Sequence, residues 1–331
     1  MAADHPASVL SAELRRRGIA SFAFAGRAAV AELARRSDPA AARDWNLAGA
    51  AGAIVAALPY DPRHADPPDD PPNGGGPWLR IAPFAAMHRY ATLARLLRSA
   101  GRAAAATLDL PARAFRVAVN SRLPEKSLAV AAGLGFIGRS SLLVSRDYGP
   151  ACVLGALFLP FEPVDGGSAV PPEAAEPGAL CGDCRACVDA CPTGAIAAPE
   201  SEPAGVDRLR CIQHWTTAEE PGPNLVESSR GDRLYGCGDC TAACPRSAGA
   251  FTPTGGLSPA GDPSPTGGLS PAALAEGLAL PSERGPGSFV AAAALAGADD
   301  ASIRALFRGT ALGLSWIPPA ALRRFAAGAM E

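Results

Sequence analysis

Residues 181–196 read CGDCRACVDACPTGAI, and this stretch decides the fold of the second half of the chain. Its spacing is C-x2-C-x2-C-x3-C-P. Three cysteines at such short intervals wrap a loop around a four-iron cubane. The fourth cysteine follows a short helical turn and, in two-cluster ferredoxins, ligates the other cluster. A second set of cysteines is therefore expected further along the chain.

The second set begins at Cys237, where CGDCTAACP repeats the spacing without its first member. Cys211, in the stretch RCIQHW, supplies the missing ligand. Exchange of the fourth ligands predicts one [4Fe–4S] cluster on Cys181, Cys184, Cys187 and Cys244, and a second on Cys191, Cys211, Cys237 and Cys240. The alternative is a pair of structural zinc sites, which also use C-x2-C pairs. The ninth cysteine, Cys152, lies in an apolar strand and is predicted to be a small buried hydrophobe.

Composition excludes several classes of protein. The 331 residues include 36 Gly and 33 Pro without a Gly-X-Y period, and no run of 18 apolar residues occurs. Collagen, coiled coil and a membrane-spanning helix are therefore excluded. Thirty basic and 32 acidic residues give a net charge of −2, which attracts neither nucleic acid nor an anionic membrane in general. The N-terminus lacks the apolar core of a signal peptide, so we expect a cytoplasmic protein.

Helical and strand patterns alternate upstream of the cysteines. Together they predict an α+β domain over residues 1–162. A Pro-rich stretch at 61–77 is expected to be a surface loop. The expected helices cover 7–17, 27–36, 85–98 and 126–132, and the expected strands cover 19–26, 53–58, 115–119, 141–144 and 152–159.

Four further segments complete the predicted organisation. A linker covers 163–180, and the double-cluster, ferredoxin-like domain covers 181–250. The sequence PTGGLSPA then occurs twice in a flexible linker over 251–272. A short helical tail over 273–331 is expected to hold helices at 302–314 and 319–327.

The glycine run Gly133-Leu-Gly135-Phe-Ile-Gly138 matches the spacing G-x-G-x-x-G. A dinucleotide site needs this motif after a strand and before a helix. Here a helical pattern precedes the run and a strand pattern follows it, which argues against a Rossmann fold. We expect a turn over 133–139 that is poor in side chains. Such a turn either lets a bulky cofactor approach the backbone or simply joins a helix to a strand.

Several stretches together carry a family resemblance. IVAALPY (54–60), NSRLPEKSLAVAAGLGFIGRSSLLV (120–144), the two cysteine blocks and RCIQHWT occur in the order found in epoxyqueuosine reductases. The chain resembles that family, which is related to the reductive dehalogenases. The resemblance implies a nitroreductase-like, cobalamin-binding α+β domain followed by the double-cluster domain. It also implies reduction of epoxyqueuosine to queuosine in tRNA, with electrons from a low-potential donor such as a ferredoxin or flavodoxin.

The same resemblance implies site residues and shows a departure. The family has an acidic proton donor where this chain has Asn120, and an amide cannot deliver a proton as a carboxylic acid does. Either the substrate differs or a neighbour takes over, and Arg122, Glu125 and Lys126 lie close in sequence. The residues implied to contact cobalamin are Asn120, Arg122, Gly133, Gly135, Gly138, Ser140 and His214.

Two other functions stay open at this point. One is a cobalamin-dependent reductase of a small molecule, favoured by Asn120 and by the near-zero net charge. The other is a two-cluster electron-transfer protein without its own catalysis. Candidate contacts to RNA phosphates are the basic residues Arg15, Arg16, Arg17, Arg304, Arg308, Arg323 and Arg324.

Overall fold

A computed structural model describes residues 5–69, 76–163, 171–198, 200–201, 203–248 and 285–331. The chain divides into two compact units. The first holds Met1–Pro59, Tyr90–Cys181 and Ala248–Leu280, and the second holds Tyr60–Arg89, Gly182–Ser247 and Pro281–Glu331. These units do not follow the sequential boundaries expected from the sequence. The segment 60–89 belongs with the cysteine-rich region and the tail.

A four-stranded antiparallel sheet forms the centre of the first unit. Its order is β1 (Ser21–Gly26), β2 (Gly52–Pro59), β7 (Cys152–Leu159) and β4 (Arg116–Val119). Every residue of β2 is buried. This explains why its sequence is a continuous apolar run and does not alternate, because both faces of the strand are covered. The expected strands at these four places are confirmed.

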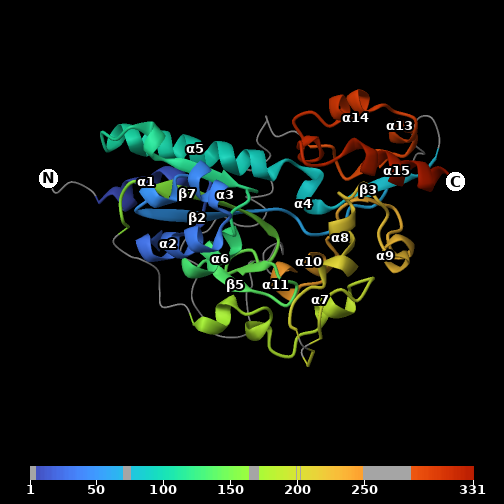
Figure 1. Cartoon of the computed structure of the whole chain (residues 1–331), viewed down its shortest axis with the longest axis horizontal. Helices are drawn as coiled ribbons and strands as arrows, with labels where there is room; N and C mark the ends of the chain where they lie inside the picture. Colours follow the sequence, from blue (N-terminus) through green and yellow to red (C-terminus); the bar gives the residue numbers. More distant parts are fainter. Residues whose placement is uncertain (1–4, 70–75, 164–170, 199, 202, 249–284) are drawn as a thin grey trace. The chain divides into compact units, whose positions relative to one another are not determined.

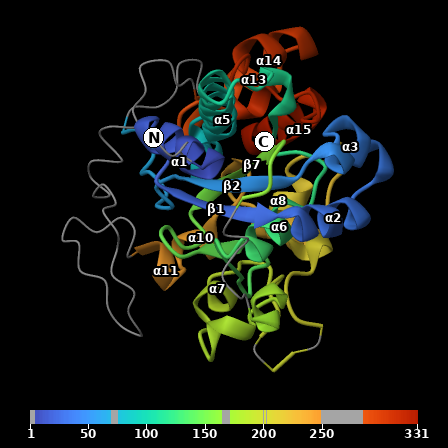
Figure 2. The same cartoon turned by 90° about the vertical axis from the view of Figure 1, so that its left-hand side faces the viewer.

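Helices cover both faces of this sheet (Figures 1 and 2). Helix α5 (Arg89–Thr107) lies on one face, and α2 (Arg27–Arg36) and α6 (Glu125–Ala131) lie on the other. Close packing of α5 requires small residues. A Cβ at Gly155 would stand 2.6 Å from Val119 Cγ2 and 3.0 Å from Leu93 Cδ2. Helix α1 (Pro6–Arg16) lies beside α5, since Arg17 Nε donates to Ser99 Oγ at 2.9 Å.

A two-stranded hairpin occupies the glycine run. Strand β5 (Gly135–Ile137) pairs with β6 (Leu143–Ser145), so the expected turn over 133–139 is wrong at its centre. The glycines masked the strand pattern because their β propensity is low. The remaining short elements of this unit are α3 (Pro39–Asp44) and the 3-10 turns η1 (Leu47–Gly49), η2 (Ala112–Ala114), η3 (Pro172–Ala175) and η4 (Ala179–Cys181).

The second unit is built from three distant stretches of chain. Its sheet has the order β8 (Arg233–Tyr235), β3 (Trp78–Ile81) and β9 (Phe289–Ala291). Buried Leu79, Leu234 and Phe307 belong to one apolar core that includes the tail. The other elements are α4 (Pro83–Ala86), α7 (Ala186–Asp189), η5 (Arg208–Arg210), α8 (Ile212–Trp215), α9 (Asn224–Ser229), α10 (Asp239–Ala242), α11 (Pro245–Ala248), α13 (Ala293–Ala296), α14 (Asp300–Leu306), η7 (Ala311–Gly313) and α15 (Pro319–Met330).

Two expected helices have different limits in the structure. The helix expected at 302–314 ends at Leu306. Gly309 has a positive φ of 77°, and the Thr310 side chain then caps a 3-10 turn. The helix expected at 85–98 starts at Arg89 and extends to Thr107. The repeat at 253–272 lies outside the described residues. None of the described helices is both long and apolar enough to cross a membrane.

Candidate iron–sulfur and catalytic site

The four cysteines predicted for the second cluster lie in the second unit and interact with one another. The pKa of Cys240 is raised to about 12, mainly by burial and further by the neighbouring thiols Cys237, Cys211 and Cys187. Burial also raises the pKa of Cys237 to about 12, and it raises the pKa of Cys211, to which Cys191 adds. Ligands must be thiolates, so iron binding at these buried sulfurs would displace protons.

The backbone around these sulfurs favours cluster binding. In each CGDC turn the glycine adopts a left-handed conformation, with φ of 57° at Gly182 and 88° at Gly238. Side chains rarely adopt this conformation, and glycine adopts it freely. The amide N–H of Ala195 donates to Cys191 Sγ at 3.2 Å. Hydrogen bonds to cluster sulfurs are one of the features that set a reduction potential.

The chemistry of the donor set fits two clusters. All nine cysteines lie among the described residues, and none of them forms a disulfide. Eight of these thiols belong to the two predicted sets, and a [4Fe–4S] cluster takes four thiolates. The number and kind of donors therefore fit two cubanes.

An ion-pair network adjoins the second cysteine set. Asp239, between Cys237 and Cys240, contacts His64 Nε2 at 3.0 Å through Oδ1 and accepts from an Arg233 guanidinium nitrogen at 2.7 Å through Oδ2. Burial opposes ionisation here, but the hydrogen bond with His64 and the charge of Arg233 lower the pKa of Asp239. Sequence reasoning missed His64, which lies in the expected surface loop. The sequence signal that could have pointed to Asp239 was the Gly-Asp pair, which occurs in both CGDC turns.

Cys181, the first ligand of the other set, lies beside the β5–β6 hairpin in the first unit. The Gly178 N–H donates to Ile137 O at 3.0 Å, and the Cys181 N–H donates to Gly178 O at 2.9 Å. A Cβ at Gly138 would stand 3.9 Å from Cys181 Sγ. The glycine run therefore adjoins a predicted cluster ligand, which the sequence alone did not show.

Each glycine of the run is also required by the capping or packing of the protein itself. Gly133, with φ of 77°, ends α6 in a Schellman motif, because its N–H donates to Val130 O and the next N–H donates to Ala129 O. A Cβ at Gly135 would stand 2.2 Å from Val144 O, and one at Gly138 would stand 2.6 Å from Val144 Cγ2. Packing and helix capping account for these glycines without a ligand.

The loop after β4 presents Asn120 at the surface with a positive φ of 49°. Glu125 Oε1 holds this loop, accepting from Ser121 N at 3.1 Å and from Ser121 Oγ at 2.8 Å. Burial raises the pKa of Glu125 although these bonds favour its charged form. Burial, with contributions from Glu125 and Cys152, raises the pKa of Tyr90 to about 12. A half-buried carboxyl whose pKa is raised above the ordinary glutamate value therefore lies next to Asn120.

The other predicted contacts are distributed over both units. Arg122 pairs with Asp44 at 2.6 Å and with Asp38 at 3.6 Å, so it is occupied by α3. Lys126 Nζ donates to Ser141 O at 2.6 Å and ties α6 to the hairpin. Asn120, Ser140 and His214 differ, because their side chains make no recorded hydrogen bond among the described residues. His214 lies on α8, one turn after Cys211.

Two of the basic residues considered as RNA contacts are used inside the second unit. Arg323 Nε donates to Ala298 O at 2.7 Å, and Arg324 donates to Glu220 O at 3.2 Å. Arg324 also lies over the Phe325 ring, 4.2 Å from its centre. These arginines hold the tail in place within its unit.

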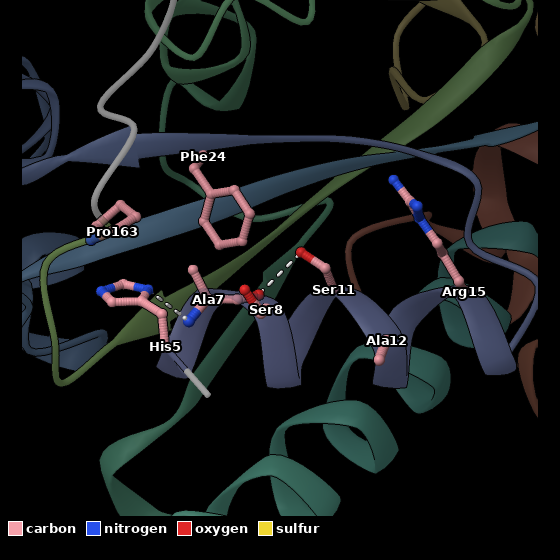
Figure 3. A pocket seen from close by; sticks show the side chains of 8 residues that line it. All are labelled: His5, Ala7, Ser8, Ser11, Ala12, Arg15, Phe24 and Pro163. Atoms are coloured by element: carbon pink, nitrogen blue, oxygen red, sulfur yellow. Dashed lines mark hydrogen bonds between the residues drawn. The ribbon is translucent and has the colours of Figure 1, made fainter. Parts of the chain in front are cut away.

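A hollow of about 650 Å³ lies between α1 and β1 (Figure 3). His5, Arg15, Phe24 and Pro163 border it. Figure 3 shows that His5 and Ser11 turn their polar atoms to the Ala7 backbone. None of the predicted cluster ligands or cobalamin contacts lines the hollow, whereas Arg15, a candidate RNA contact, borders it. The polar groups of His5 and Ser11 serve the first turns of α1.

Comparisons with known proteins agree with this site. Residues 180–247 match the family described as a 4Fe-4S double cluster binding domain. An epoxyqueuosine reductase from Yersinia pestis is 40% identical over 134 residues, which cover 40% of this chain and 29% of the relative. The chain resembles epoxyqueuosine reductases. The domain match supports two iron–sulfur clusters.

Solved structures show the same fold at low identity. An epoxyqueuosine reductase from Streptococcus thermophilus has a TM-score of 0.64 at 19% identity, covering 96% of this chain and 78% of that chain. An epoxyqueuosine reductase crystallised with an epoxyqueuosine-modified tRNA-Tyr stem loop has the same TM-score at 20% identity, covering 97% and 79%. The sequence match spans only about a third of the curated relative, whereas the fold is shared over nearly the whole of this chain.

Proposed function

We propose that this chain is an iron–sulfur-dependent reductase that converts epoxyqueuosine to queuosine in tRNA. The observation that carries the proposal is the pair of four-cysteine sets, matched to a double-cluster domain and joined to an α+β unit of the same fold as epoxyqueuosine reductases. Removal of the epoxide oxygen as water consumes two electrons and two protons. Two cubane clusters provide a low-potential route for the electrons.

Cobalamin is the further cofactor that the resemblance implies, and a nitroreductase-like domain over 1–162 would hold it. Within that domain, Asn120 and Ser140 are the predicted contacts whose side chains stay available to such a ligand, because the predicted glycines and Arg122 have internal roles. His214, which the resemblance also implies, belongs to the second unit. When bound, cobalamin would supply a low-valent metal nucleophile for epoxide opening. A ferredoxin or flavodoxin is the proposed electron donor, and tRNA as substrate would place the reaction in the cytoplasm.

Glu125 is our proposed proton source in place of the family's acidic residue. Among the neighbours of Asn120, Arg122 is paired with carboxylates and Lys126 is bonded to a carbonyl. Glu125 is a carboxyl whose pKa is raised by burial, so it holds a proton at higher pH than an exposed glutamate. A general acid works best when its pKa is near the operating pH.

A second function, reduction of a small molecule, is favoured by Asn120 and by the internal use of Arg323 and Arg324. A strain lacking this chain distinguishes the two functions. Accumulation of epoxyqueuosine at the expense of queuosine, measured by mass spectrometry of digested tRNA, supports the tRNA function. Unchanged nucleosides reject it.

The cofactor is tested separately by the visible spectrum of anaerobically purified protein with and without cobalamin. A shift of the cobalamin bands on binding is expected. If cobalamin does not bind, both reductase functions fail and a two-cluster electron carrier remains.

A further inference from the structure

A second hollow, of about 290 Å³, lies in the first unit between α5 and the start of β4. Three arginines border it: Arg98 and Arg102, one turn apart on α5, and Arg113 on η2. Its apolar wall is made by Phe115, Val117 and Leu157. Its volume is at the low end of ligand pockets, roughly 300 Å³, which suits a small group better than a whole cofactor.

None of the described residues balances the charge of this hollow. No ion pair or hydrogen bond is recorded for Arg98, Arg102 or Arg113 within the described ranges, and no carboxylate lines the hollow. Asp109 is nearby in sequence but is not among the lining residues. By contrast, Arg17, which directly follows α1, is neutralised by Glu13. Three exposed guanidinium groups around one hollow are suited to phosphate oxygens, which Arg binds through paired N–H groups.

Gly101, which lies between Arg98 and Arg102 on α5, lets this helix lie close to the sheet. A Cβ there would stand 3.3 Å from Phe115 Cβ and 3.4 Å from Leu157 Cδ1. The hollow also lies on the same strand as the candidate active site. Asn120 follows Val117 by three residues, about 10 Å of extended chain.

We propose that Arg98, Arg102 and Arg113 bind backbone phosphates of the RNA whose modified nucleoside is held near Asn120. This inference rests on the proposed tRNA substrate and adds the surface that holds it. It assigns RNA binding to residues other than the N-terminal and tail arginines considered from the sequence. Phosphate contacts position a nucleic acid without reading its bases, so this binding is independent of base sequence.

The test measures the affinity of the full-length protein for an unmodified tRNA anticodon stem loop. Fluorescence anisotropy gives this affinity at salt concentrations between about 0.05 and about 0.5 M. For single strands each phosphate contact contributes about 0.7 to the slope of log affinity against log salt. The triple variant R98Q/R102Q/R113Q should therefore lose about 2 from this slope and bind about 100-fold more weakly at 0.1 M salt.

The matched control is Arg116→Gln. Arg116 is also exposed, but it alternates with Val117 along β4 and therefore points to the opposite face of the sheet. It should bind RNA as the wild type does. An unchanged slope in the triple variant, or an equal loss in Arg116→Gln, overturns the proposal. So does arginine-dependent binding to phosphatidylserine vesicles with no arginine-dependent RNA binding.

This binding assay can fail separately from the proposed function. If the protein binds RNA through the three arginines but does not reduce epoxyqueuosine, the RNA site stands and the proposed reaction fails. If it reduces epoxyqueuosine with the same KM for tRNA in the triple variant, the reaction stands and the RNA site fails. Equal circular dichroism spectra and melting temperatures establish that the exposed variants are folded.

Discussion

Replacing Glu125 by Gln separates the two roles that the structure gives this side chain. Glu125 Oε1 accepts from Ser121 N at 3.1 Å and from Ser121 Oγ at 2.8 Å, and an amide oxygen can accept both bonds. The loop should survive, so the free energy of unfolding should change by less than about 1 kcal/mol. The amide cannot deliver a proton. Turnover should fall by about 10²- to 10⁴-fold, the usual contribution of a general acid.

Glu125→Ala provides the comparison for the structural role. It leaves both Ser121 donors without their acceptor in a partly buried loop, at a cost of about 1–3 kcal/mol for each unsatisfied donor. A loss of at least about 2 kcal/mol in the free energy of unfolding is expected. Urea unfolding followed by circular dichroism measures the stability, and single-turnover conversion of epoxyqueuosine in tRNA measures the rate. Wild-type turnover in Glu125→Gln refutes the acid role, and wild-type stability in Glu125→Ala refutes the loop-holding role.

The remaining predictions concern pH, ligation and packing. Burial raises the folded-state pKa of Glu125. The wild type should therefore lose stability relative to Glu125→Gln as the pH rises from the ordinary glutamate range through that raised pKa. Urea midpoints of the two proteins that move in parallel over this pH range would disprove it. Cys240→Ser should lower iron content by about half, whereas Cys152→Ser should leave it unchanged; equal iron in both variants contradicts the ligand assignment. Gly135→Ala should destabilise the protein by about 1–3 kcal/mol, because the new Cβ would meet Val144 O. Gly328→Ala, in open space on α15, should stabilise the protein by about 0.5–1 kcal/mol. Melting temperatures of the two variants that shift in the same direction would contradict this packing.

The cysteine spacing was predictable from the sequence because cluster ligation depends on local chain geometry. The central strands were also predictable, since β2 and β7 are buried apolar runs. Strands β3 and β9 were not, because each is short and gains its stability from partners far along the chain. The same dependence on distant segments explains why residues 60–89 were expected in the wrong unit.

Contacts outside the cysteine motifs were harder to predict from the sequence. Gly133, Gly135 and Gly138 were interpreted as a cofactor-facing run, but a glycine is required equally by a helix cap and by a close strand pair. Asn120 was found through its departure from the family pattern. Its support by Glu125 needed the three-dimensional loop, because a side chain that bonds a neighbouring backbone leaves no spacing signal. The contact between His64 and Asp239 could not be predicted either, because the two residues, like β3 and β9, lie far apart in the sequence.

One measurement tests the central claim most directly. The protein, reconstituted with iron, sulfide and cobalamin and supplied with a low-potential reductant, is incubated anaerobically with epoxyqueuosine-containing tRNA, and the digested nucleosides are separated by mass spectrometry. Queuosine should form in place of epoxyqueuosine, and it should not form with Cys240→Ser. Fully loaded protein that leaves epoxyqueuosine intact would contradict the account.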